Sequence, residues 1–170
     1  MPRTPSFRFV SDLPTDPALY VLYGGTGRSR HIAYVGVSGN LRRRIRQHFL
    51  KRQSSVVTGT SAASLNPDLV TRLEWWLRER FEDKDHLQAA ELVAFDKLEP
   101  TLRSRGRITG EAETLAEDRE FAEEVQAMLE GDPTGAVDIP TLSDALSRIE
   151  RLERRVDQLE QRLEETQNDT

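Results

Sequence analysis

The end of the chain repeats apolar residues at alternating intervals of three and four, and no other feature restricts the possible fold so strongly. The repeat runs through Leu142, Ala145, Ile149, Leu152, Val156, Leu159 and Leu163. A narrow stripe of seven-residue period is best buried against a second helix. Its central a positions are β-branched and leucine fills most d positions, which favours two parallel helices. We therefore predict a parallel dimeric coiled coil over residues 142–166.

Charges beside this stripe favour the same arrangement. In a parallel pair, Arg148 would face Glu153 of the second chain, and Arg155 would face Glu160. An antiparallel pair would place like charges opposite each other. The alternative is a single amphipathic helix that folds back on its own domain.

Charge also divides the chain into two parts. Residues 1–110 hold 18 basic and 11 acidic residues, whereas residues 111–170 hold 6 basic and 18 acidic ones. A basic domain suits a polyanionic partner, because Lys and Arg displace the counterions of phosphates. We expect one basic domain over 1–110, which we interpret below as the catalytic domain, an acidic amphipathic helix over 111–130 that packs on it, and a linker over 131–141. The acidic part has a plainer interpretation as a solvated helical face.

The sequence has no cysteine, which excludes disulfides and thiolate metal sites. No apolar run approaches the roughly 18 residues of a membrane span. The first residues lack the apolar core of a signal peptide. We therefore expect a cytoplasmic protein that does not contact membranes.

Hydrophobic patterning predicts a small set of elements in the basic part. Glycine-rich residues 24–29 form a hairpin connection between two strands, and Asn40 is a good N-cap for a helix. The expected strands are 19–23, 31–36 and about 70–77, and the expected helices are about 41–51 and 85–98.

The helix over 41–51 carries charge on and beside its apolar stripe. Leu41, Ile45 and Phe49 define the stripe, and Arg44 and His48 fall on it or at its edge. Such residues either line a site or extend past the helix edge into solvent. The basic side chains of the outer face are candidates for phosphate contacts, with ordinary solvation as the alternative: Arg42, Arg43, Arg46, Lys51 and Arg52.

Glu91 lies within the apolar arc of the second helix. A carboxylate rarely faces a core without a partner, because its desolvation costs several kcal/mol. Mg²⁺ needs only one or two carboxylates when waters and phosphate oxygens complete its coordination. The candidate partners are therefore a metal ion and an internal arginine, Arg44.

Taken in order, these residues resemble the GIY-YIG nuclease domain over roughly residues 16–103. The matching pieces are Ala18-Leu19-Tyr20, Ala33-Tyr34-Val35-Gly36, Asn40-Leu41-x-x-Arg44-x-x-x-His48, and Glu91 nine residues before Pro100. The resemblance implies an α+β fold, in which a three-stranded antiparallel sheet is flanked by helices. It also implies metal-dependent hydrolysis of DNA phosphodiester bonds.

The resemblance implies a role for each polar residue. Tyr20 would deprotonate or orient the attacking water, with Tyr34 supporting it. Arg44 would stabilise the charge of the phosphate, and His48 would assist proton transfer. Glu91 would bind one Mg²⁺ or Mn²⁺ ion. The alternative function is a catalytically inactive nucleic-acid-binding module or a coiled-coil adaptor.

Two positions depart from the family pattern. Ala18 stands where the first motif has glycine, and Leu102-Arg103 stands where the family often has asparagine. Neither departure removes a proposed catalytic group.

Overall fold

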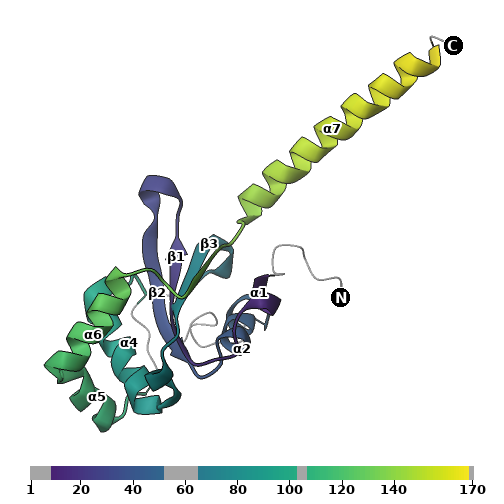
Figure 1. Ribbon diagram of the computed structural model, residues 1–170. Helices are drawn as coiled ribbons and strands as arrows, with labels where there is room; N and C mark the ends of the chain where they lie inside the picture. The colour runs from purple at the N-terminus through teal and green to yellow at the C-terminus, as the bar shows by residue number, and fades with distance from the viewer. Residues whose placement is uncertain (1–8, 52–64, 103–106, 169–170) are drawn as a thin grey trace. The chain divides into compact units, whose positions relative to one another are not determined.

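The computed structural model describes residues 9–51, 65–102 and 107–168. It divides into two compact units, Met1–Ile139 and Pro140–Thr170. The first unit has an α+β fold, as predicted, with one antiparallel sheet and helices on both of its faces (Figure 1). This unit includes residues 111–130, which the sequence predicts to pack on the domain, and continues to Ile139.

The sheet has four strands rather than the predicted three. Its spatial order is β2-β1-β3-β4, with all neighbours antiparallel. The strands are β1 (Ala18–Gly24), β2 (His31–Ser38), β3 (Val70–Trp76) and β4 (Gly135–Asp138). The three predicted strands are present, close to their expected limits.

The fourth strand corrects the prediction of a linker over 131–141. β4 pairs with β3 from Arg72↔Asp138 to Trp75↔Gly135. Ile139 beside it is buried. The strand covers an edge of β3 whose backbone groups would otherwise lack partners. Its four residues, next to glycine and proline, are too short to give a strand pattern in the sequence.

One face of the sheet is covered by α1 (Phe9–Asp12), α2 (Leu41–Arg46) and the π-helical turn η3 (Gln47–Lys51). The backbone of α2 begins after Asn40, whose side chain accepts a hydrogen bond from the Arg43 N–H, so the predicted N-cap is confirmed. The predicted helix over 41–51 is correct in extent, but its second half widens into the π turn. A buried apolar cluster fills this side, including Leu22, Leu41, Ile45 and Leu73.

The other face is covered by α4 (Lys84–Leu98), and α5 (Gly110–Glu117) and α6 (Arg119–Glu130) pack on α4 (Figure 1). The single acidic helix predicted over 111–130 is therefore two helices. Asp118 causes the break, because it has an extended backbone and its side chain caps α6 by accepting from the Phe121 N–H. Phe121, Val125 and Met128 are buried in the cluster that α4 also lines.

Short 3-10 turns connect these elements. They are η2 (Gly27–Ser29), η4 (Pro67–Leu69) and η5 (Glu79–Glu82).

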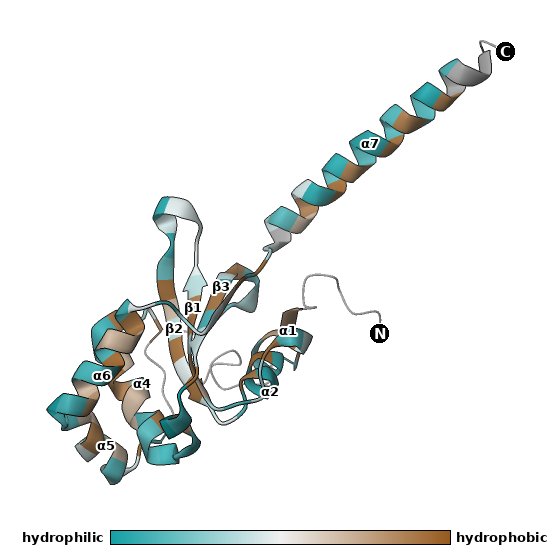
Figure 2. Ribbon diagram, viewed as in Figure 1, coloured by the Kyte–Doolittle hydropathy of each residue, from teal (hydrophilic) through white to brown (hydrophobic). Residues whose placement is uncertain are grey.

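The second unit is one helix, α7 (Leu142–Asn168), which begins after a Thr141 cap. Brown apolar residues interrupt its hydrophilic surface at intervals (Figure 2). The large apolar side chains of α7 that the structure describes are about half exposed, from Leu159 at 47% to Leu163 at 63%. In the described part of the chain, no helix is both long and apolar enough to cross a membrane.

Candidate active site

Strands β1 and β2 bring Tyr20 and Tyr34 together on the face that α2 covers. Tyr20 pairs with Gly36, so Tyr34, two residues before Gly36, projects on the same side of the sheet. The ring centroids are 6.0 Å apart, and both side chains are buried. A β-carbon at Gly36 would lie 2.7 Å from the Tyr20 hydroxyl and 2.7 Å from a Tyr34 ring carbon. The glycine therefore leaves the space that both rings occupy.

The π turn carries His48 into this pair of rings. Its Nε2 lies 2.8 Å from the Tyr20 hydroxyl, in a buried hydrogen bond between residues 28 positions apart. The His48 ring centroid is 6.0 Å from that of Tyr20 and 5.9 Å from that of Tyr34. Single π turns inside helices are frequent at functional sites. The three rings form one cluster, which we call the Tyr–His cluster: Tyr20, Tyr34 and His48.

Arg44 lies one turn before His48 and interacts with the cluster. Burial disfavours its positive charge, but Coulombic attraction and hydrogen bonding to Tyr20 and Tyr34 outweigh this effect and raise its pKa above the usual value. The Arg44 Nε is buried without a hydrogen-bond partner, although the side chain as a whole is only partly buried. A guanidinium N–H without an acceptor can donate a hydrogen bond to an anionic oxygen.

Burial sets the protonation states of the cluster. It raises the pKa of Tyr20 well above 10, and the neighbouring Tyr34 adds to this shift. It also raises the pKa of Tyr34, with the charge of Glu91 as the next cause. Burial and the positive charge of Arg44 lower the pKa of His48 to about 3. At neutral pH, both phenols keep their protons and the imidazole is uncharged.

Glu91 projects from α4 and is 5% exposed. Its charge raises the pKa values of both Tyr20 and Tyr34, so it acts on the Tyr–His cluster electrostatically. The ion pairs of the described residues do not join Glu91 to Arg44, the alternative partner expected from the sequence.

The donor set determines which cation Glu91 could hold. Among the described residues, no group of three or more His, Asp or Glu side chains lies together. The candidate ligand is the Glu91 carboxylate. This fits a hard ion such as Mg²⁺, which keeps several waters and takes phosphate oxygens from a substrate.

The outer basic residues of the helix divide into two kinds. Arg42 is partly buried, and its Nε donates to the Leu13 carbonyl at 2.7 Å, so it also holds the chain before β1. Arg43, Arg46 and Lys51 are exposed. Arg52, the fifth candidate for phosphate contact, lies outside the described residues.

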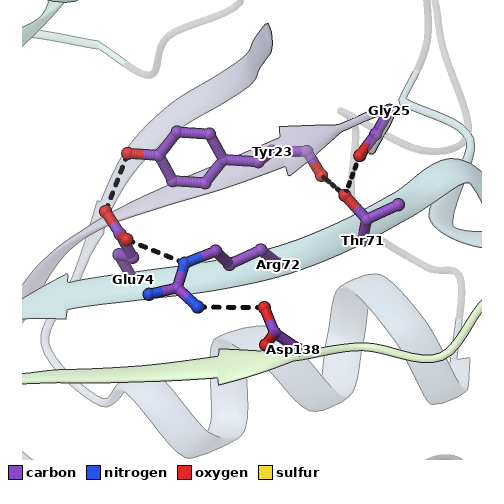
Figure 3. Close-up of polar contacts among 6 residues, drawn as sticks. All are labelled: Tyr23, Gly25, Thr71, Arg72, Glu74 and Asp138. Carbon is purple, nitrogen blue, oxygen red and sulfur yellow. Dashed lines mark hydrogen bonds and ion pairs between the residues drawn. The ribbon is translucent and has the colours of Figure 1, made fainter. Parts of the chain in front are cut away.

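A polar network on the opposite face joins β1, β3 and β4 (Figure 3). The Tyr23 hydroxyl donates to Glu74 Oε2 at 2.7 Å, and Arg72 bonds both Glu74 at 2.8 Å and Asp138 at 2.9 Å. Burial and the hydrogen bond to Glu74 raise the pKa of Tyr23, so this phenol also stays protonated. The network attaches β4 to the sheet, and no pattern in the sequence indicates it.

Sequence reasoning also missed the direct bond between Tyr20 and His48 and the part of Gly36 in it. The available signal for Gly36 was the Tyr34-x-Gly36 spacing, which puts both residues on one side of a strand. For comparison with known proteins, no family model matches the chain, and no curated protein or solved structure matches it either.

Proposed function

We propose that this protein is a metal-dependent endonuclease of the GIY-YIG type that hydrolyses DNA phosphodiester bonds. The observation that carries the proposal is the buried hydrogen bond between Tyr20 and His48, held beside Tyr34 and the Arg44 guanidinium. A packed core has no need of a neutral histidine bonded to a phenol next to an arginine with an unpaired N–H. Hydrolysis of a phosphodiester uses a proton acceptor, an anion-binding group and a water aligned for attack.

The proton acceptor in this mechanism is His48, acting through Tyr20. Tyr20 cannot act as the base by itself, because its pKa lies well above 10 and the phenol keeps its proton at neutral pH. Neutral His48 can accept the Tyr20 proton at Nε2 when its own proton is on Nδ1. The Tyr20 oxygen can then take a proton from the attacking water as its own proton moves to His48. The water oxygen bonds to phosphorus, the bond from phosphorus to the departing sugar oxygen breaks, and that oxygen takes a proton from solvent. Tyr34 orders this pair by packing on both rings.

Charge on the phosphate is stabilised from two sides. Arg44 would donate its unpaired Nε–H to a nonbridging phosphate oxygen. Glu91 would hold one Mg²⁺ or Mn²⁺ ion, and the bound ion would supply Lewis acidity and polarise the substrate. The charge of Glu91 raises the tyrosine pKa values, so compensating that charge would ease proton movement at Tyr20.

The partners we propose are DNA and a second copy of the chain. The α7 stripe pairs two chains in parallel through residues 142–166, with Arg148 and Arg155 opposite Glu153 and Glu160. Such a dimer carries two nuclease domains, and binding by one raises the effective concentration of the other. The proposed location is the cytoplasm.

A cleavage assay with matched variants tests the function. The full-length protein, given duplex, branched and single-stranded DNA with Mg²⁺ or Mn²⁺, should cut at least one of them and be inactive in EDTA. Glu91→Gln should abolish cleavage and preserve DNA binding. Asp96→Asn removes an exposed carboxylate from the same helix and should change neither. Cleavage by Glu91→Gln at the wild-type rate, or none by the wild type on any substrate, would overturn the proposal.

A further inference from the structure

The turn between β1 and β2 carries exposed basic residues that the proposed mechanism does not use. Arg28, Arg30 and His31 are all exposed. They lie in a long stretch without acidic residues: residues 17–67 hold eight Lys or Arg and no Asp or Glu. The turn and α2, both within unit one, are therefore both positively charged. The turn projects from the end of the sheet, apart from the helices on either face (Figure 1).

The turn has a defined conformation. Gly25 and Gly27 have φ values of 70° and 54°, which favour glycine. A reciprocal pair of hydrogen bonds joins Thr26 and Ser29. Thr71 on β3 donates to the Gly25 carbonyl at 2.5 Å and ties the base of the turn to the sheet. Arg28 and Arg30 therefore project from an ordered loop, so their binding to a ligand costs less conformational entropy.

Few acidic groups compete for these arginines. In the part of the chain that the structure describes, neither Arg28 nor Arg30 belongs to an ion pair. The carboxylates of the adjoining strands, Glu74 and Asp138, are both bound by Arg72 (Figure 3). Among the residues that the structure describes, the turn is thus an exposed cationic surface without an acidic partner.

The position of the turn relates it to the Tyr–His cluster. β2 runs from His31 beside the turn to Ser38 just before α2, a length of about 23 Å at 3.3 Å per residue. Tyr34 lies between these ends. Ile32 packs in the cluster under α4, so its neighbour His31 points to the opposite side. A β-bulge in β2, where the pairing with β1 skips Ala33, puts Tyr34 on that same side.

We propose that this turn is a second phosphate-binding surface, with Arg28 and Arg30 contacting the DNA backbone on one side of the cleavage site while α2 contacts it on the other. The inference rests on the proposed function, because the site between the two surfaces is the cleavage site. The length of β2, about 23 Å, corresponds to roughly seven base pairs of duplex at 3.4 Å each. The contacts would be independent of base sequence and would position the scissile phosphate at the Tyr–His cluster.

The salt dependence of DNA binding tests this surface directly. Each phosphate contact contributes about 0.9 to the slope of log K against log salt. Full-length Arg28→Ala/Arg30→Ala should therefore show a slope smaller by about 1.8 than wild type, measured by fluorescence anisotropy on a 20-base-pair duplex in EDTA. Arg28→Lys/Arg30→Lys keeps the charges and should keep most of the slope. The control Arg80→Ala/Arg119→Ala removes two charges paired with α6 carboxylates and should leave the slope unchanged.

Outcomes for the turn and for the nuclease are separable. A slope lower by about two contacts in the alanine pair, with the Arg80/Arg119 control at the wild-type slope, supports the second surface. An unchanged slope in the alanine pair, or an equal loss in the Arg80/Arg119 control, overturns the second surface and leaves the nuclease proposal standing. A slope loss in a protein that binds DNA and never cuts it would overturn the nuclease alone.

Discussion

Replacing His48 should remove a large part of the pH dependence of stability in the first unit. The His48 side chain is fully buried and uncharged, and its pKa is about 3 in the fold. In the unfolded chain, a histidine titrates near 6.5. Between these values, the unfolded state binds a proton that the folded state does not, so acid favours unfolding. This destabilisation by His48 is absent above the pKa of the unfolded chain, grows as the pH falls below about 6.5, and reaches its full size at about pH 3.

The size of the effect follows from the two pKa values. Each pH unit inside this window costs up to about 1.4 kcal/mol. From pH 6.5 to 4.5, the loss is about 2 kcal/mol, because the unfolded histidine is only half protonated at the upper limit. With a urea m value of about 1.5 kcal/mol/M, the unfolding midpoint should fall by about 1.5 M. Tyr20, Tyr34 and Arg44, which surround His48, have pKa values raised far from this window.

Urea unfolding followed by tryptophan fluorescence measures the effect. Trp75 and Trp76, the two tryptophans of the chain, both lie in β3 and report on the first unit. His48→Gln keeps a neutral hydrogen-bonding side chain and should lose about 2 kcal/mol less than wild type between pH 6.5 and 4.5. His31→Gln, at an exposed position of β2, should retain the wild-type slope. Equal slopes for wild type and His48→Gln would refute a buried neutral histidine.

Three further changes test the site and the assembly. Tyr20→Phe should lower the cleavage rate by about 10²- to 10⁴-fold in a single-turnover assay, since it removes the proton-transferring hydroxyl and little volume; a wild-type rate would contradict the relay. Gly36→Ala should reduce cleavage and cost about 1–3 kcal/mol in urea unfolding, because its methyl group overlaps the Tyr20 hydroxyl; unchanged stability and activity would show that the rings tolerate it. Leu152→Lys/Leu159→Lys should convert a dimer into a monomer in analytical ultracentrifugation at tens of micromolar, and a monomeric wild type would refute the coiled coil.

The sequence predicts best where a pattern repeats or a local signal is strong. The strands β1, β2 and β3 follow apolar runs bounded by turn residues, and α2 starts at the Asn40 cap. The helix predicted from Asp85 is α4, whose cap is Asp83. Each of these signals lies within the element that it predicts, so no tertiary contact is needed to read it.

Two predictions failed, one because of a contact with a distant part of the chain and one because of a single helix cap. β4 depends on an open edge of β3 and on the bond from Arg72 to Asp138, 66 residues apart. The break between α5 and α6 depends on Asp118, a residue that reads equally well as part of an acidic helical surface. Sequence patterns depend on residues that are close along the chain. β4 is instead determined by its pairing with β3, and the break between α5 and α6 is determined by the backbone conformation of Asp118.

The Tyr–His cluster combines both situations. The residue types and their order predict that Tyr20, Tyr34, Arg44 and His48 belong to one site. Helical spacing alone does not decide whether Arg44 and His48 face that site or lie at a solvent-exposed edge of the helix. The π turn removes that ambiguity by placing His48 at 0% exposure against the Tyr20 hydroxyl. The same burial that brings the groups together makes Tyr20 harder to ionise and keeps His48 neutral. The chemistry proposed for the cluster therefore depends on paired proton movement along one 2.8 Å hydrogen bond, since neither residue could act as an independent base or acid at neutral pH.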